Sequence, residues 1–147
     1  MDEKKSRKTF VNGAITSEFI GKSIAKHRTN KNIGAHSIFL GQVRNDIVNN
    51  KEVKAIEYTA YAGMAEEKFH EIREAAFGKY PLTCLHIYHS LGKVNSGEIS
   101  LFVFTSSAHR KDAIKACEEI VERIKSEVPV WGKEIFDDES HQWKVNS

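Results

Sequence analysis

The chain has 147 residues, of which 40% are apolar and 29% are charged, a composition typical of one globular domain. A net charge of +2 provides no overall basic field for nucleic acid, so an anion site would have to come from local clustering. No apolar run approaches the roughly 20 residues that span a bilayer, and the charged first residues lack the apolar stretch of a secretion signal. We therefore expect a single cytoplasmic domain over residues 1–147, with residues 1–8 disordered.

The first half of the chain predicts one helix and two strands. The helix runs from the capping pair Thr16–Ser17 to about His27. An apolar, β-branched stretch predicts a strand over 33–40, and the polar segment 42–52 predicts a loop. Alternating residues predict a partner strand over 53–61, so the two strands could form a hairpin.

The second half predicts two long helices and two further strands. Apolar spacing predicts a helix over 64–80 with acidic residues in its first turn, then strands over 82–89 and 99–105. A last helix spans about 112–128, where Pro129 stops it. The side chains of this helix that are predicted to face the core are Ile114, Cys117, Val121, Ile124 and Val128. The element order favours an α+β domain with a largely antiparallel sheet.

The cysteines and histidines form no recognisable metal-binding spacing. Cys84 and Cys117 lie far apart; a disulfide between them stays open, although reduced thiols are the simpler interpretation. His86 and His89 are three apart on a predicted strand and would point to opposite faces. A histidine inside a strand, such as His36, is usually a satisfied core residue. The sequence predicts no metal site.

Basic residues crowd the start of the last helix, in the segment 106–111 with sequence SSAHRK. A helix N-terminus disfavours cations by about 0.3–1 kcal/mol each. Solvated charge balanced by Asp112 is one explanation. The other is that an external anion completes the site, held by backbone N–H groups, both serine hydroxyls, His109 and Arg110. Spacing alone leaves both open.

Two other cationic positions are candidates for chemistry. Arg44 follows a predicted strand, where it could clamp a phosphate with two hydrogen bonds or could simply be a surface residue. Lys125 suits the C-terminal dipole of the last helix. If Lys125 is partly buried beside Pro129 and Trp131, a lowered pKa would instead equip it for proton transfer or nucleophilic attack.

Taken together, several segments in this order resemble the catalytic large subunits of molybdopterin synthase, the MoaE family. The segments that carry the resemblance are Phe39–Asn45, Glu57–Tyr61, Met64–Glu66, His89–Gly92, Ser107–Arg110, Arg123–Lys125, Val128–Trp131 and Lys133–Glu134. Each segment alone is weak, but the combination is specific and spans residues 33–143, nearly the whole domain.

The resemblance implies an α/β hammerhead-like fold and a homodimer that forms the core of a heterotetramer. The partner would be a ubiquitin-like sulfur-carrier small subunit (MoaD-like), whose C-terminal Gly-Gly thiocarboxylate enters the active site. Two sulfurs would pass to cyclic pyranopterin monophosphate, giving the dithiolene of molybdopterin for molybdenum cofactor biosynthesis. Because the sulfur donor is a protein, no dissociable cofactor is expected.

The resemblance also implies site residues. Those expected to line the substrate site are Gln42, Val43, Arg44, His109, Arg110, Lys125, Gly132, Lys133 and Glu134. Arg44, His109 and Arg110 would hold the phosphate and developing negative charge. Lys125 and Lys133 would be catalytic, with Lys125 in proton transfer or at the donor's terminal carbonyl.

Gly132 departs from the family pattern, and the distance from His109 to Lys125 bears on how the site is assembled. The family carries a lysine directly after the tryptophan, where this chain has Gly132; Lys133 could take that role, or the second lysine role is weakened. His109 and Lys125 would lie about 24 Å apart along one helix. We therefore expect His109 and Arg110 of one subunit to meet Lys125 and Arg44 of another.

Two alternatives belong to other functional classes. Gly132 favours a non-catalytic adaptor that keeps the fold and binds the small subunit without turnover, whereas the other site residues oppose it. An RNA-binding module would need basic residues among the aromatics of a sheet face. Phe102 and Phe104 supply aromatics, but their strand has no lysine or arginine.

Overall fold

The computed structural model describes residues 9–144, so the expectation for residues 1–8 lies outside the described part. In chain order the elements are β1 (Phe10–Asn12), α1 (Ser17–Ala25), β2 (Ala35–Gln42), β3 (Ile47–Val48), β4 (Lys51–Ala60), α2 (Ala62–Lys79), β5 (Leu82–Asn95), β6 (Ile99–Ser107), α3 (Arg110–Glu127), β7 (Val130–Phe136) and β8 (His141–Trp143). Within this range no helix is both long and apolar enough to cross a membrane.

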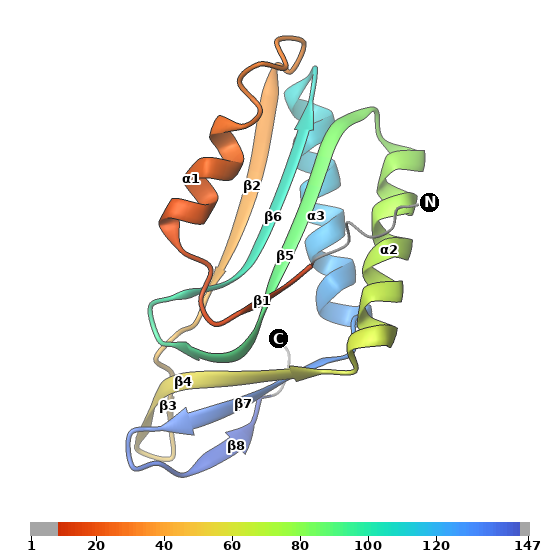
Figure 1. Ribbon diagram of the computed structural model, residues 1–147. Coiled ribbons are helices and arrows are strands. Elements are labelled where there is room, and N and C mark those ends of the chain that lie inside the picture. The colour runs from red at the N-terminus through yellow and green to blue at the C-terminus, as the bar shows by residue number, and fades with distance from the viewer. Residues whose placement is uncertain (1–8, 145–147) are drawn as a thin grey trace.

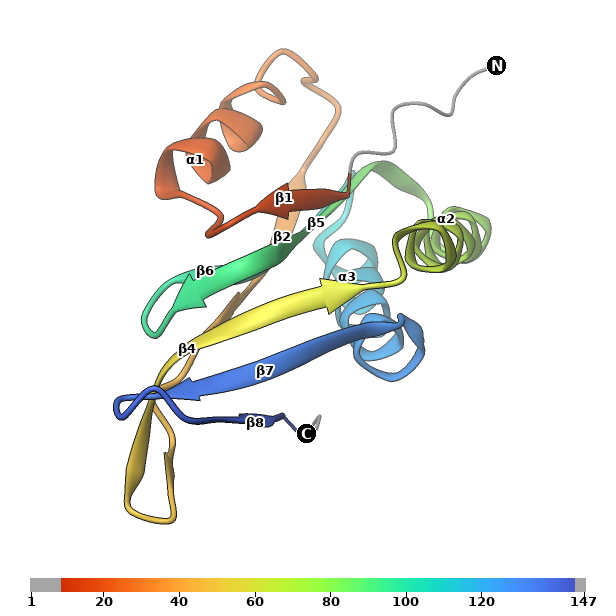
Figure 2. The ribbon, with the colours of Figure 1, turned by 60° about the horizontal axis from the view of Figure 1, so that its bottom comes forward.

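The strands form one sheet in the order β2-β6-β5-β4-β7-β8, with β1 added to β5 and β3 to β4. All pairs are antiparallel except β1 with β5. Helix α1 covers one side of β2, β6 and β5, and α2 and α3 cover the other (Figures 1 and 2). The predicted α+β class with a mostly antiparallel sheet is therefore confirmed.

Helix α1 begins where the sequence predicts. Thr16 is its N-cap, and the Thr16 hydroxyl accepts a hydrogen bond from the Phe19 amide at 3.1 Å. Beneath α1, Phe102 and Phe104 of β6 are fully buried and pack with Ile15. These aromatics form a core layer, which removes the stacking surface that an RNA-binding module would need.

Helices α2 and α3 pack on the opposite side through a larger core that includes Phe69, Ile72 and Ile120. Helix α2 begins two residues before the predicted start, so the acidic residues expected in its first turn lie beyond it. Ile114 was expected in the core, but its side chain is 53% exposed. It lies in the first turns of α3, at the edge of the face that covers β2 and β6.

The predicted strands 33–40 and 53–61, observed as β2 and β4, do not form the hairpin that the sequence suggested. β2 pairs with β6, whereas β4 pairs with β5 and β7. The polar segment between β2 and β4, expected to be a loop, holds the short strand β3, which forms its own hairpin with β4. The positive φ values of Asn49 (52°) and Asn50 (64°) suit the two-residue turn between them.

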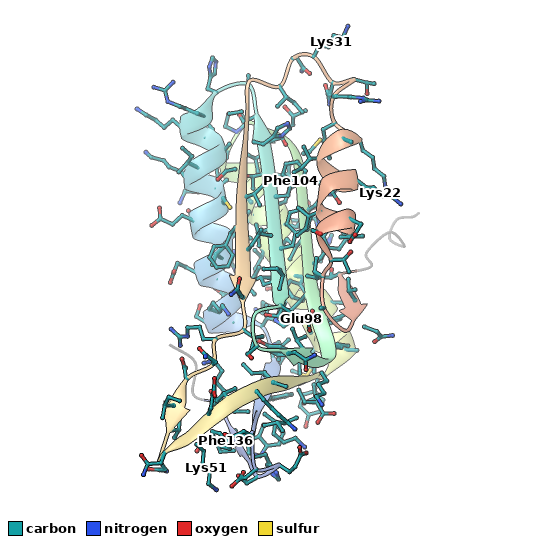
Figure 3. All side chains as sticks on the ribbon, turned by 90° about the vertical axis from the view of Figure 1, so that its left-hand side faces the viewer. Lys22, Lys31, Lys51, Glu98, Phe104 and Phe136 are labelled. Carbon is teal, nitrogen blue, oxygen red and sulfur yellow. The ribbon has the colours of Figure 1, made fainter. Side chains whose placement is uncertain are left out.

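Strand β5 is longer than predicted, and this length organises the molecule. Its first part pairs with β6, and its last part, from Gly92 onward, pairs with β4. Gly92 has a φ of +83°, a conformation that side-chain-bearing residues rarely adopt. Beyond it, β4, β7 and β8 form a second group of strands around a small core that contains Phe136 (Figure 3). Strands β7 and β8 were not predicted from the sequence.

Candidate active site

Two adjoining pockets lie where the end of α3 approaches both groups of strands. Their volumes are about 240 Å³ and 290 Å³. Three residues line both pockets: Tyr58, Lys125 and Lys144. Of the site residues predicted from the sequence, the pockets contain Gln42, Val43, Arg44, Lys125, Gly132 and Glu134. Segments from both halves of the chain therefore meet at one place.

The segment after β2 supplies an exposed arginine to the first pocket. Arg44 has 65% of its side chain exposed, and its Nη2 lies 3.3 Å from Asp46 Oδ2. Val43 beside it is 2% exposed and packs in the small core with Ile56. The Val43 amide donates to the Glu98 carbonyl, so Val43 anchors the segment while Arg44 projects from it.

Lys125 lies in the last turn of α3, and its side chain enters both pockets. Burial of the ammonium group lowers the pKa of Lys125, and the nearby charges of Lys144 and Arg44 lower it further. Three cations therefore share one region, and a bound anion would relieve their repulsion.

The far wall of the pockets contains two polar residues that sequence reasoning missed. His89 is buried, and its Nδ1 donates to the Ser90 carbonyl at 2.8 Å. Burial lowers the pKa of His89 to about 4, so the imidazole is neutral at neutral pH. The Tyr58 hydroxyl donates to Ser100 Oγ at 3.2 Å, and burial raises the pKa of this phenol. Tyr58 and His89 lie in two of the segments that carry the family resemblance, Glu57–Tyr61 and His89–Gly92. Neither residue has neighbouring charges in the sequence that would single it out as part of a site.

Strand β7 separates the predicted Gly132-Lys133-Glu134 segment onto two faces, because side chains alternate along a strand. Gly132 and Glu134 line the pockets. Lys133 lies on the other face, 3.4 Å from Glu57 Oε1, with its Nζ 6.0 Å from the Trp143 ring centroid. The structure therefore does not bring Lys133 together with Lys125.

Lys144 occupies the region that Lys133 was expected to fill. Its backbone amide donates to the Gly132 carbonyl at 2.8 Å, so it lies directly beside the glycine. Its Nζ lies 4.0 Å from Glu134 Oε2, and Glu134 is held in place by Gln142 at 3.0 Å. A Cβ on Gly132 would lie 2.9 Å from Ile56 Cγ2, so there is no room there for a larger residue without movement.

His109 and Arg110 lie at the opposite end of α3 from Lys125. His109 is the N-cap of this 18-residue helix, which is about 27 Å long, and both residues are exposed. The two serines before them, which the anion-site explanation includes, have hydroxyls that contact other groups of the protein. Ser106 Oγ lies 2.7 Å from His36 Nδ1, and Ser107 Oγ donates to the Pro81 carbonyl at 2.9 Å.

Comparison with known proteins identifies the same family as the motifs. Residues 15–127 match the family model described as MoaE protein. A Staphylococcus aureus relative named "Molybdopterin synthase catalytic subunit" is 40% identical over 76% of this chain and 74% of its own length. The relative of that name from Bos taurus is 37% identical over 77% of this chain, which spans only 59% of the bovine protein's length.

Solved structures agree with the fold. The crystal structure of molybdopterin synthase from Staphylococcus aureus superimposes with a TM-score of 0.82 at 34% identity, covering 95% of this chain and 98% of that chain. A Helicobacter pylori structure described as a complex of subunits 1 and 2 of molybdopterin-converting factor has a TM-score of 0.79, covering 93% of this chain and 89% of that chain. At 23% identity it supports the fold alone. The family model, the sequence relatives and the fold therefore agree that this chain belongs to the MoaE family.

Proposed function

We propose that this protein is the cytoplasmic catalytic subunit of a molybdopterin synthase. It would transfer two sulfurs from the C-terminal thiocarboxylate of a small carrier protein to cyclic pyranopterin monophosphate. The observation that carries this proposal is the pair of adjoining pockets in which Arg44, Lys125 and Lys144 gather positive charge. The half-buried Tyr58 lines both pockets, and the buried His89 lines the second. A phosphate-bearing substrate supplies the negative charge that such a pocket favours.

Each transfer breaks the carbon–sulfur bond of one thiocarboxylate. On the pterin side chain, one carbon–oxygen bond breaks as the new carbon–sulfur bond forms, so sulfur replaces oxygen at that carbon. Water then supplies the replacement oxygen, so that the C-terminus of the carrier becomes a carboxylate. Because each carrier brings one sulfur, two carriers are used for each product. Lys125 suits proton transfer at the carrier's terminal carbonyl, because its lowered pKa leaves more neutral amine near pH 7 than an ordinary lysine has. Arg44 would bind the phosphate through two hydrogen bonds.

We assign the second lysine role to Lys144 instead of Lys133. Lys144 lies in both pockets and beside Gly132, the position where the family carries its lysine. Lys133 is directed toward Glu57 on the other face of β7. The residue directly after β8 would thus provide the ammonium group that this chain lacks at position 132.

The pocket would be completed by a second copy of the chain. His109 and Arg110 are exposed at the far end of α3, too distant to contact the substrate beside Lys125 in the same subunit. In the homodimer that we propose, these two residues of one subunit contribute to the pocket of the other. The carrier protein would then make a heterotetramer, consistent with the two-subunit complex described for the Helicobacter pylori relative.

The direct test mixes the purified protein with a thiocarboxylated carrier and cyclic pyranopterin monophosphate, and measures dithiolene product. We expect product with the unaltered protein, a loss of at least about 100-fold in Lys125→Ala, consistent with losing proton transfer, and about 10-fold or more in Lys144→Ala. Lys133→Ala is the matched control on the other face of β7 and should keep most activity.

Carrier binding without any product would support the alternative of a non-catalytic adaptor and contradict the synthase proposal. Product that falls in Lys133→Ala but not in Lys144→Ala would reverse the assignment of the second lysine. Circular dichroism of each variant checks that the loss of product does not come from unfolding.

A further inference from the structure

Three side chains with metal-binding atoms meet on the sheet face beneath α1, far from the pockets. His27 lies just beyond the C-terminal end of α1, while Cys84 and His86 are two residues apart on β5 and so share a face. Their ligand atoms all lie within 4.8 Å of one another, and all three residues are partly buried. The two imidazoles approach most closely, with Nε2 of His27 and Nε2 of His86 3.1 Å apart.

The hydrogen bond on the other side of the His27 ring fixes its tautomer. His27 Nδ1 lies 2.8 Å from the Ser23 carbonyl oxygen, which can only accept, so Nδ1 carries the hydrogen. In the neutral ring, Nε2 then presents its lone pair to Cys84 and His86. Metal-bound histidines commonly donate their second N–H to a backbone carbonyl in this way, which orients the ring toward the ion.

We propose that His27, Cys84 and His86 bind one zinc-class metal ion, with a water molecule as the fourth ligand. One thiolate with two imidazoles suits Zn²⁺ or Co²⁺, whereas Mg²⁺ and Ca²⁺ prefer oxygen ligands. Tetrahedral zinc with bonds of about 2.05 Å to nitrogen places two nitrogens about 3.3 Å apart, close to the observed 3.1 Å. The sulfur completes the site after a small side-chain rotation. Binding releases the Cys84 thiol proton to solvent.

The surroundings of this cluster suit a structural ion. The Phe104 ring lies 4.9 Å from the His27 ring and 5.9 Å from the His86 ring, measured between centroids, and forms an apolar wall under α1 (Figure 3). His36 is a packing neighbour, since its Nδ1 already contacts Ser106 Oγ. The ion would link the end of α1 to β5, joining residues 59 positions apart in sequence.

The test uses the full chain, stripped of metal by a chelator and titrated with Co²⁺. We expect one equivalent to produce tetrahedral cobalt bands and a thiolate-to-cobalt charge-transfer band, and Zn²⁺ to displace it. Cys84→Ser should abolish the charge-transfer band. His86→Ala should weaken cobalt binding by more than about 100-fold, since loss of a ligand exceeds the 10–100-fold effect of losing an outer partner.

Cys117→Ser and His70→Ala provide the matched controls. Cys117 is the other cysteine and is a buried residue of α3, and His70 is exposed on α2. Both variants should bind cobalt as the unaltered chain does. Zn²⁺ should also raise the Tm of the unaltered chain but not that of Cys84→Ser. A charge-transfer band that survives Cys84→Ser, or a Tm that Zn²⁺ leaves unchanged in the unaltered chain, would overturn the proposal. Neither readout depends on sulfur transfer.

Discussion

Lys125 and Lys144 present two ammonium groups to the same pocket, and Arg44 adds a third cation. A protein stabilises such a cluster poorly without an anion, because each charge raises the free energy of the others. Folding nevertheless brings the three cations together: Lys125 comes from the end of α3, Arg44 from the segment after β2, and Lys144 from the residue after β8. The unfavourable repulsion among the three cations therefore lies at the place where a phosphate would bind.

The mutual repulsion can be measured directly. Lys144→Gln should raise the pKa of Lys125 toward its ordinary value, because removing the neighbouring positive charge favours the protonated form. Lys133→Gln, on the opposite face of β7, should leave the pKa of Lys125 unchanged. An NMR titration of isotopically labelled lysine side chains measures both. Equal shifts in the two variants would show that Lys144 is not the relevant neighbour.

His89 links the pocket wall to the stability of the fold. Burial holds its pKa at about 4, whereas an unfolded histidine titrates near 6.5. Between these values the unfolded chain binds the proton more readily, so the free energy of unfolding should fall as pH drops from about 6.5 to about 4. The contribution is at most about 3 kcal/mol.

Urea unfolding at pH 7 and pH 4.5 measures this loss. His89→Gln cannot take up the proton, so its stability difference between the two pH values should be smaller than that of the unaltered chain. His70→Gln is the exposed control and should keep the full difference. If His89→Gln shows the same acid dependence as the unaltered chain, the imidazole does not contribute to it.

At the scale of elements, the packing of β7 against β4 leaves no space for a side chain at the position after Trp131. Gly132 pairs with Tyr58 of β4, and a Cβ at Gly132 would lie 2.9 Å from Ile56 and 3.4 Å from the Tyr58 ring. The glycine lets the Tyr58 ring and the Ile56 side chain lie against the β7 backbone. The space a side chain would need is thus already filled by β4, and the cation comes from Lys144 instead.

Gly132→Ala should destabilise the protein by about 1–3 kcal/mol, because the added methyl group overpacks this contact. Gly78→Ala in α2 is the matched control, since a Cβ there meets nothing within 4 Å. It should stabilise the protein by about 0.5–1 kcal/mol through the helix preference for alanine. Chemical denaturation measures both changes. A Gly132→Ala variant as stable as the unaltered chain would indicate that Ile56 moves without cost.

At the scale of the whole molecule, α3 works as a spacer. It holds His109 and Arg110 at one end and Lys125 at the other, about 24 Å apart. One compact pterin phosphate cannot contact both ends, so the proposed site needs two subunits.

Subunit mixing tests this arrangement. His109→Ala and Lys125→Ala should each be nearly inactive, whereas heterodimers formed by refolding them together should regain activity. One of the two pockets then has all its residues, so activity per heterodimer should approach half that of the unaltered dimer. Heterodimers no more active than either parent would show that each pocket uses residues of one subunit.

Much of this protein follows from the sequence by itself. Local signals fix α1 through its Thr16 cap and α3 through its apolar spacing, and Pro129 directly follows the C-cap of α3. The order of the motifs predicts the family. These features depend on neighbours in the chain, so the sequence carries them directly.

The tertiary structure alone decides which strands pair, on which face each side chain lies, and which distant residues meet. The hairpin prediction was wrong because pairing depends on burial across the whole sheet, which reading the chain locally cannot weigh. Lys144, which the sequence did not single out, takes the place expected of Lys133, because alternation along β7 and the position of β8 decide which lysine faces Lys125. His27 joins Cys84 and His86 only because α1 folds over β5. A site made from separate elements depends on long-range packing, and that packing is settled by the free energy of the whole fold.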